Sequence, residues 1–431
     1  MDRRQRALVL VGFGVLIIGA TLAVSAATAP DLQVDDGSQR QTLVGSQGGG
    51  PGWHELGSVY LLDGSKIEWR EDSADSYFDV TMLDNGSVMA GFMHSGYEKG
   101  CDPYETPCTK TGFRIIDPNA DDPQVVSEYS FPVRSESNSE VHDVERLDSG
   151  EYLITDMDAE RLVTVENGEE TWEWRASDRY NPPEDPTQRD WLHINDVDVI
   201  NETHYLVSVR NANQLVIVER GAGAVDVINE DNGGSDESCL VRGSQLVPDD
   251  DGDVRCGNPD VLNHQHNPQW LGNGAVLVAD SDNDRVVELH RTESGEWEPA
   301  WVLAEAGGVA LDWPRDADRL DNGNTLVTDT LNTRTFEISQ NGTVVWSRQT
   351  PEIPYEAERL PEGERVGAKP YTANGTVVEP DDGVPVLSTG MTVLRAVVPS
   401  TPFWFNEPQL GFSLLGVVLV VGGSIDRWRA G

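Results

Sequence analysis

The stretch DWLHINDVDVINETHYLVSVR, residues 190–210, has the pattern of one edge of a β-propeller blade. Polar residues open it, an alternation of apolar and polar residues follows, and a turn at 201–203 leads into a second strand. Each strand residue rises about 3.3 Å, so two strands of similar length return the chain to its starting height. The pattern therefore predicts that His193, Asn195 and Arg210 meet at one point.

The same pattern of two strands joined by a tight turn recurs along the chain. Two apolar strands joined by an Asn-Gly or Ser-Gly dipeptide are typical of a β-hairpin, because these turns need positive φ. Counting residues 193–209, five copies are visible, and the spacing of 49 residues from Gly274 to Gly323 fits four short strands with their turns. The other two glycine turns of this kind are centred on Gly86 and Gly150.

A sixth blade is expected from the two ends of the repeat region. Propellers commonly close by pairing strands from their termini, which leaves no open edge. We expect residues 57–69 and 385–397 to supply these strands. The sequence thus predicts an all-β fold, a β-propeller of about six four-stranded blades over residues 51–400, preceded by a linker at 30–50.

Two apolar runs flank the repeats, at 7–29 and 403–425, and each can reach across a bilayer, which takes about 20 residues. Arginines lie outside both runs, in the basic segment 1–6 and in the tail 426–431. By the positive-inside rule, we expect two transmembrane helices, both termini in the cytoplasm, and the propeller on the extracellular side of the cell membrane. Small residues at 25–29 leave a cleaved signal peptide as the alternative for the first run.

Charge excludes one class of partner. The chain carries 31 basic and 74 acidic residues, a net charge of −43, spread along its length. We interpret this as the solvated surface of a halophilic protein. Binding to nucleic acid is excluded, because no basic stripe is present to neutralise phosphates.

Four cysteines agree with an extracellular location. Cys101 and Cys108 flank a six-residue loop, and Cys239 and Cys256 bracket an acidic insertion. Neither pair has the spacing of zinc ligands, so we predict a disulfide in each loop.

Histidines are concentrated in the segments that lead into the innermost strand of each predicted blade. Strand capping accounts for the acidic and amide residues at these positions, but nothing in capping favours imidazole. Because the loops that lead into the innermost strands crowd one mouth of a propeller, these side chains predict a shared site in the central channel. Four of the eight histidines belong to this predicted site: His142, His193, His264 and His266. In another blade, Trp313-Pro-Arg315 occupies the corresponding place.

These motifs resemble the arylsulfate sulfotransferases, of a haloarchaeal, membrane-anchored type. The resemblance rests on Trp191-Leu-His193-Ile-Asn195-Asp followed by Ser208-Val-Arg210, on Gln265-His266-Asn-Pro-Gln-Trp-Leu271, and on His142-Asp-Val, each before its own turn. It covers roughly residues 50–350. The resemblance implies transfer of a sulfuryl group from an aryl sulfate ester to a phenolic acceptor, without a cofactor, through a covalent sulfo-histidine.

Within this resemblance, His266 corresponds to the nucleophile, and His193, Asn195 and Arg210 to the sulfate-binding group. His142 corresponds to a further channel histidine. The chemistry is consistent: a neutral imidazole is a competent nucleophile, a guanidinium fork fits two sulfate oxygens, and a second imidazole can protonate the leaving oxygen. We expect Arg315 as a second cation and His264 as a further substrate-binding side chain.

Three alternatives remain from the sequence. The propeller could bind an anionic ligand, or serve as an interaction scaffold, without catalysis. His264 and His266 alternate on a strand, so with His142 or His193 they could form a zinc or copper centre. The loop 280–284 could hold calcium, although a simple turn is the more common role of such a loop.

Overall fold

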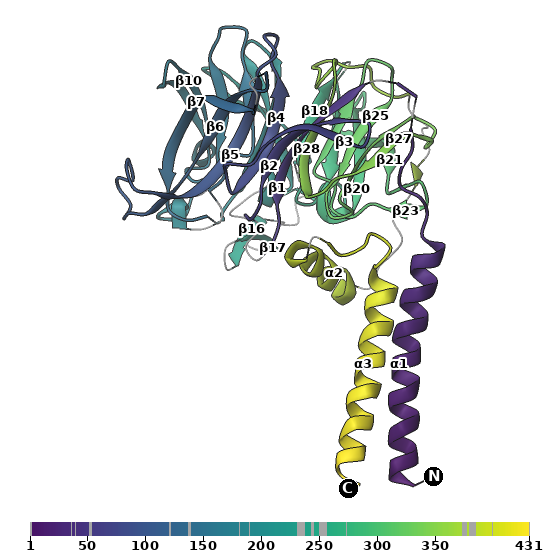
Figure 1. The fold of residues 1–431 in the computed structure, drawn as a ribbon. Helices are drawn as coiled ribbons and strands as arrows, with labels where there is room; N and C mark the ends of the chain where they lie inside the picture. Colours follow the sequence, from purple (N-terminus) through teal and green to yellow (C-terminus); the bar gives the residue numbers. More distant parts are fainter. Residues whose placement is uncertain are drawn as a thin grey trace. The chain divides into compact units, whose positions relative to one another are not determined.

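The computed structural model divides the chain into two units, residues 32–380 and residues 1–31 with 381–431 (Figure 1). It describes all residues except 1, 36, 39, 51–53, 120, 121, 137, 138, 181, 189, 231–237, 243, 244, 250–256, 273, 373–376, 379–384, 399 and 431. Side chains are also left undescribed at 238–242, 245–249, 377, 378 and 385.

The larger unit is a β-propeller, and within the described residues it has six antiparallel blades of four strands, as predicted. The sheets are β28-β1-β2-β3, β4 to β7, β8 to β11, β12 to β15, β18 to β21 and β24 to β27. A short strand, β29, adds to the fifth of these sheets. The bounds are β1 (Gln41–Gly48), β2 (Ser58–Asp63), β3 (Lys66–Glu71), β4 (Ser76–Met82), β5 (Val88–Tyr97), β6 (Cys108–Asp117), β7 (Gln124–Val133), β8 (Val144–Arg146), β9 (Tyr152–Asp156), β10 (Arg161–Glu166), β11 (Glu169–Arg175), β12 (Ile194–Asn201), β13 (His204–Val209), β14 (Gln214–Glu219), β15 (Gly223–Ile228), β16 (Ser238–Arg242), β17 (Gln245–Asp249), β18 (His266–Leu271), β19 (Ala275–Asp280), β20 (Arg285–Arg291), β21 (Trp297–Leu303), β22 (Glu305–Ala306), β23 (Val309–Ala310), β24 (Asp316–Arg319), β25 (Thr325–Asp329), β26 (Arg334–Ile338), β27 (Val344–Gln349), β28 (Ile353–Arg359) and β29 (Val377–Val378).

The closing blade differs from the prediction. Its innermost strand is β28, which pairs antiparallel with β1 in the register Val44 to Ala357. Residues 57–69 belong to this blade as expected, but Pro385–Val397 forms a helix, α2. In the run at 385–397, Leu387, Met391 and Leu394 are spaced by four and three residues, which is the period of a helix and not of a strand, and the run forms 13 helical residues.

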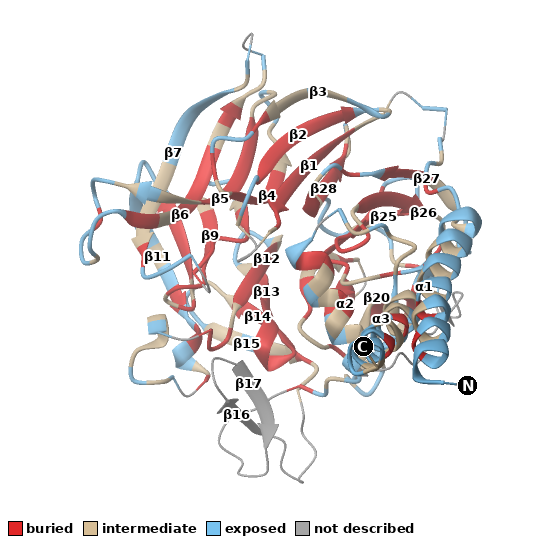
Figure 2. Cartoon of the chain, turned by 60° about the horizontal axis from the view of Figure 1, so that its bottom comes forward, coloured by how far each residue is buried: buried red, intermediate tan, exposed pale blue. Residues whose placement is uncertain are grey.

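The glycine turns behave as their sequence predicts. Gly86, Gly150, Gly274 and Gly323 all have positive φ, between 71° and 95°. Their side-chain-free backbone adopts this conformation without steric cost and connects the first two strands of four blades. Between the blades, side chains such as Leu206, Leu277 and Phe336 are fully buried, and the central strands are buried along most of their length (Figure 2).

Each innermost strand has one edge that its own sheet does not pair, and the neighbouring blade satisfies that edge. Asp79 accepts a hydrogen bond from the backbone N–H of Val144 at 3.2 Å, and Asp143 accepts one from Val197 at 2.5 Å. A buried strand edge with no partner would be costly, so these side chains lock the blades together. The series continues around the propeller with Asp198 to Trp270, Gln269 to Arg319, Asp316 to Ala357 and Glu356 to Val80.

We call Asp79, Asp143, Asp198, Gln269, Asp316 and Glu356 the clasp residues. Asp143 and Asp316, expected to cap their own strands, instead bind the next blade. The clasp from Glu356 in β28 to Val80 in β4 closes the circle.

The smaller unit contains α1 (Arg3–Thr28), α2 (Pro385–Val397) and α3 (Glu407–Trp428). α1 and α3 are long and apolar enough to cross a membrane, in agreement with the two predicted runs. They pack antiparallel through small residues: a Cβ added to Gly14 would lie 2.5 Å from the carbonyl oxygen of Gly416. Arg6 and Asp426 form an ion pair at one end, with 2.5 Å between Nη2 and Oδ2, and Gln409 donates to Ser25 at the other, at 2.7 Å.

One of the two predicted disulfides is present, between Cys101 and Cys108, with their Cα atoms 5.7 Å apart. The second prediction, Cys239 with Cys256, falls on side chains outside the described residues.

Candidate active site

The structure brings the predicted histidines together where the innermost strands of the propeller meet. The rings of His142 and His193 have centroids 5.3 Å apart, and His142 stacks on Tyr355 at 5.2 Å with an angle of 24° between the planes. His266 meets the other side of this group, its ring 6.1 Å from that of Tyr355. Side chains from blades far apart in the sequence therefore form one cluster.

The cluster has a simple origin in the propeller repeat. Each innermost strand contributes the side chain that directly precedes the acidic or amide residue at the start of the strand. Because the six strands are related by the propeller axis, equivalent positions form a ring. The ring consists of Phe78, His142, Asn195, His266, Arg315 and Tyr355.

A second set of side chains is placed by unusual backbone geometry. His193, His264 and Trp313 each lie two residues before a ring position, and all have positive φ, 54°, 47° and 53°. A left-handed conformation is uncommon for such bulky residues and persists only where the surroundings hold it. Here a side chain of the preceding blade accepts a hydrogen bond from each backbone N–H: Glu160 at 2.7 Å, Asn213 at 3.0 Å and Asp284 at 2.8 Å respectively.

The hydrogen bonds of His266 fix its tautomer. Its Nδ1 lies 2.8 Å from the hydroxyl of Ser281, and that hydroxyl donates its proton to the carbonyl of Pro314 at 2.7 Å. The ring must therefore donate from Nδ1, which also lies 3.1 Å from the carbonyl of His264. Burial, together with the charges of Arg315 and Arg210, holds the pKa of His266 well below its usual value. At neutral pH, Nε2 carries a lone pair.

His193 is paired with a carboxylate. Its Nδ1 lies 2.6 Å from Oδ1 of Asp190. Burial alone would raise the pKa of Asp190, but His193 and then Arg210 outweigh it and hold that pKa below its usual value. An ionised partner of this kind orients the imidazole and supports it whenever it carries a second proton.

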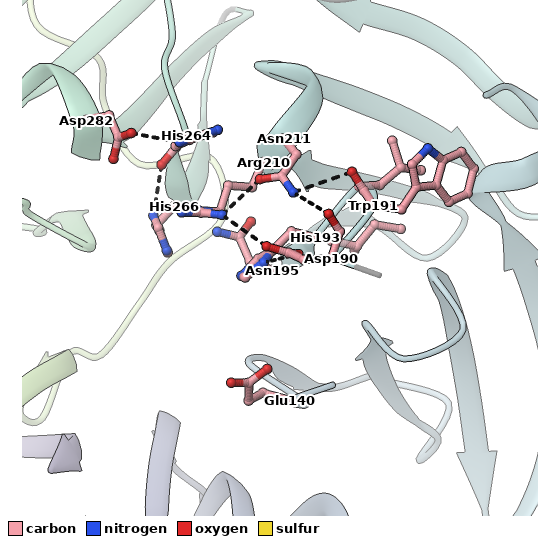
Figure 3. Close-up of polar contacts among 12 residues, drawn as sticks. Glu140, Asp190, Trp191, His193, Asn195, Arg210, Asn211, His264, His266 and Asp282 are labelled. Carbon is pink, nitrogen blue, oxygen red and sulfur yellow. Dashed lines mark hydrogen bonds and ion pairs between the residues drawn. The ribbon is translucent and has the colours of Figure 1, made fainter. Parts of the chain in front are cut away.

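Two buried arginines bring positive charge to the site. Arg210 donates to Asn211 at 2.9 Å and lies 4.0 Å from Asp190; Figure 3 shows it between the His264–His266 pair and the Asp190–His193 pair. Arg315 donates to Gln47 and lies over the rings of Trp313 and Tyr355, 4.4 and 4.9 Å from their centroids.

The pKa of Arg315 is lowered to about 10, first by burial and then by the charge of Arg210, against the opposing effect of Tyr355. It stays charged at neutral pH. Two cations that disfavour each other in a buried site favour a bound anion, which offsets their repulsion.

The other predicted residues of this cluster are Asn195, His264 and His142. Asn195 is fully buried and donates to the carbonyl of Gln265 at 3.0 Å. His264 is held by Asp282 at 2.7 Å, and the same carboxylate accepts from Trp313 at 2.9 Å. His142 has no hydrogen-bond partner at Nδ1 among the described residues, and burial keeps its pKa well below its usual value, so its ring is neutral.

The metal alternatives find no support in the described part of the chain, where no group of three or more His, Cys, Asp or Glu side chains is arranged to hold a metal ion. The carboxylates of loop 280–284 have other partners: Asp280 binds Arg285 at 2.7 Å, Asp282 binds His264, and Asp284 accepts from Trp313. Through these contacts, the loop 280–284 holds His264 and Trp313 in place at the site.

Sequence reasoning missed three features. Tyr355 was hidden by the wrong assignment of the closing blade. Asp190 could have been found, because it lies three residues before His193, but many acidic residues have such spacing. Glu140, seen across the site in Figure 3, pairs with Nε2 of His54 at 3.0 Å; burial opposes ionisation, yet His54, and then His142 and His193, hold the pKa of Glu140 well below its usual value.

Comparisons with known proteins add the following. A model of the Arylsulfotransferase (ASST) family matches residues 124–297, which include His142, His193, Arg210 and His266. No curated protein matches the chain. Among solved structures, a protein of unknown function from Bacteroides caccae is 15% identical with a TM-score of 0.48, over 75% of this chain and 100% of the other.

The periplasmic gluconolactonase of Pseudomonas aeruginosa is 11% identical, with a TM-score of 0.43, over 75% of this chain and 99% of the other. Virginiamycin B lyase from Staphylococcus aureus is also 11% identical, with a TM-score of 0.36, over 64% of this chain and 70% of the other.

Proposed function

We propose that this protein is an arylsulfotransferase-like enzyme, which moves a sulfuryl group from an aryl sulfate ester to a phenolic acceptor through a sulfo-histidine at His266. The family match over residues 124–297 and the propeller fold support the class of activity. The observation that carries the mechanism is the tautomer of His266, whose Nδ1 is occupied by Ser281 and whose Nε2 is free to attack.

In the first half-reaction, Nε2 of His266 attacks the sulfur atom of the donor and the bond from sulfur to the aryl oxygen breaks. The bonding electrons leave with the aryl oxygen, which takes a proton from His193. The resulting neutral His193 keeps its hydrogen bond to Asp190. This arrangement separates nucleophile and acid on two imidazoles, each oriented by its own partner.

In the second half-reaction, a phenolic acceptor gives its proton to His193 and attacks the same sulfur atom. The bond from sulfur to Nε2 breaks, and His266 returns to its starting state. Both transition states carry negative charge on the non-bridging oxygens, as in phosphoryl transfer. Arg210 and Arg315 stabilise that charge, and Asn195 and the rings of His142 and Tyr355 shape the surrounding wall.

A transfer assay tests the proposal. Purified protein in high salt is given an aryl sulfate ester and a phenol, and an alkaline quench before mass spectrometry detects an added SO₃ group on His266. We expect His266→Ala to abolish both transfer and the adduct. His204→Ala is the matched control, because His204 lies at the β12–β13 turn, partly exposed and away from the ring.

Transfer by His266→Ala at the wild-type rate would overturn the mechanism. Binding of aryl sulfate by the wild type, without turnover and without an adduct, would instead support the alternative of a non-catalytic propeller that binds an anionic ligand. The two arginines would serve either function, so only the fate of the sulfuryl group separates them.

We further propose that the propeller lies outside the cell membrane, with both termini in the cytoplasm, and that the acidic surface reflects a halophilic source. The antiparallel pairing of α1 and α3 supports this topology, because it brings the basic N-terminal segment and the arginines at 427 and 429 to the same end. Protease protection of both termini in right-side-out vesicles tests it.

A further inference from the structure

Helix α2 is too short to span a membrane, and its exposed face is more apolar than that of a helix on the surface of a soluble protein. Its 13 residues extend about 20 Å, against about 30 Å for the hydrocarbon core of a bilayer. It comes directly before α3 in the chain and contacts its first turns: a Cβ added to Gly390 would lie 3.3 Å from Leu410, and one added to Gly411 would lie 3.4 Å from Leu387.

Two polar side chains of α2, Arg395 and Ser388, are bonded within the protein. Arg395, its only charged residue, is buried and donates to the carbonyl oxygens of Phe403 and Phe405 at 3.0 and 3.1 Å. Ser388 donates to the carboxylate of Glu407 at the start of α3. These groups are used within the protein, so they offer little to water or to lipid headgroups.

The apolar side chains of α2 face outward. Val386, Val393 and Val397 are 82%, 57% and 46% exposed, and their spacing of seven and four residues places them on one face. A helix on the surface of a soluble protein shows the opposite arrangement, with its apolar stripe against the core. The next helix, α3, also exposes apolar side chains: Phe412 and Val418 are 53% and 66% exposed.

We propose that α2 lies in the interface of the bilayer that α1 and α3 cross, with its valine face among the lipid acyl chains. The occupant of this face is lipid hydrocarbon, because α2 packs against a candidate membrane span that also exposes apolar side chains. Since the only charge of α2 is bonded within the protein, the contact does not depend on anionic headgroups. This inference is independent of the proposed enzymatic activity.

Photocrosslinking in vesicles of the full-length protein tests it. A photoreactive residue is introduced as Val393→p-benzoylphenylalanine, with Val397→p-benzoylphenylalanine as a second site in case the first disturbs folding. Val126, in β7 of the propeller, is the matched control, because it is also a valine and is 59% exposed. Val418 of α3 is the positive control.

We expect lipid adducts from residues 393, 397 and 418, none from residue 126, and equal yields in vesicles of zwitterionic and of anionic phospholipid. Adducts at 418 without any at 393 and 397 would overturn the proposal. So would a crosslink from 393 to a second copy of the chain, or lipid adducts at 393 that form only with anionic lipid.

Discussion

Nδ1 of His266 lies 2.8 Å from the hydroxyl of Ser281, and the proton of that hydroxyl is already given to Pro314. The pair thus determines which ring nitrogen is free, without a charged partner. A carboxylate at the same place would raise the basicity of the ring, whereas a hydroxyl leaves it neutral in a site with two arginines. A neutral nucleophile suits attack on an anionic ester.

Ser281→Ala should therefore reduce kcat about 2- to 10-fold, since one neutral hydrogen bond is worth about 0.5–1.5 kcal/mol and the carbonyl of His264 remains as an acceptor. KM should change little. The matched control is Thr330→Ala, which removes the hydroxyl at the equivalent position of the next blade. Equal losses in both variants would assign the effect to general packing.

Arg210→Gln and Arg315→Gln should each lower kcat/KM for an aryl sulfate about 100-fold or more, because each removes a buried cation that faces the developing charge. Arg210→Lys should recover only part of the loss, since an ammonium group lacks the guanidinium fork. The control is Arg220→Gln, which breaks a pair with Glu151 at the edge of its blade. Steady-state kinetics at fixed salt distinguish these cases, and unchanged kinetics in both site variants would remove the anion-binding role.

The clasp residues predict an unusual dependence of stability on pH. Burial raises the pKa of Asp143, Asp198 and Asp316 to about 7 each. A raised folded-state pKa gives stability that is present below the unfolded value of about 3.9 and is lost as pH rises through about 7. Asp198→Asn keeps an oxygen acceptor for Trp270 but cannot ionise.

We therefore expect Asp198→Asn to gain thermal stability over wild type by a few degrees at pH 8 and by much less at pH 5. Calorimetry at both pH values checks it, and taking the difference between variants cancels the opposite effect of the buried histidines. Asp148→Asn, on an exposed turn, should show no such change. A gain that is the same at both pH values would contradict the pKa argument.

Gly14→Leu should loosen the α1–α3 pair, because its Cβ would meet the backbone of Gly416 at 2.5 Å. Gly12→Leu is the control, since nothing lies within 4 Å of a Cβ at that position. Hydrogen exchange of the protein in nanodiscs should show faster exchange in both helices of the first variant only. Equal protection would mean that the two helices do not depend on each other.

The sequence predicted most of the propeller because its turns have a chemical signature. Gly274 and Gly323 sit in hairpins that only a few residue types allow. The closing blade lacks this signature, since β28 and β1 come from opposite ends of the repeat region and no turn connects them. Their pairing depends on the closure of the circle, which no local pattern encodes.

The site was predictable where rare residues mark it and was missed where common ones do. His142, His193 and His266 stand out among eight histidines, whereas Asp190 is one of 74 acidic residues. Its contact with His193 depends on the left-handed backbone at that histidine, which in turn depends on Glu160 of the preceding blade. The contact of Glu160 with His193 joins different blades, so it becomes visible only once the fold is known.

Because a ribosome makes the chain from the N-terminus, the pairing of β28 with β1 can form only late in synthesis. A nascent chain that has emerged as far as Gln349 already contains every histidine and arginine of the site, yet it lacks the strand that carries Tyr355 and the last clasp. Until that strand is present, the clasps that join β28 to the blade of β24–β27 and to the blade of β4–β7 cannot form. The ring of side chains at the candidate site is therefore complete only after the last strand of the propeller has been made.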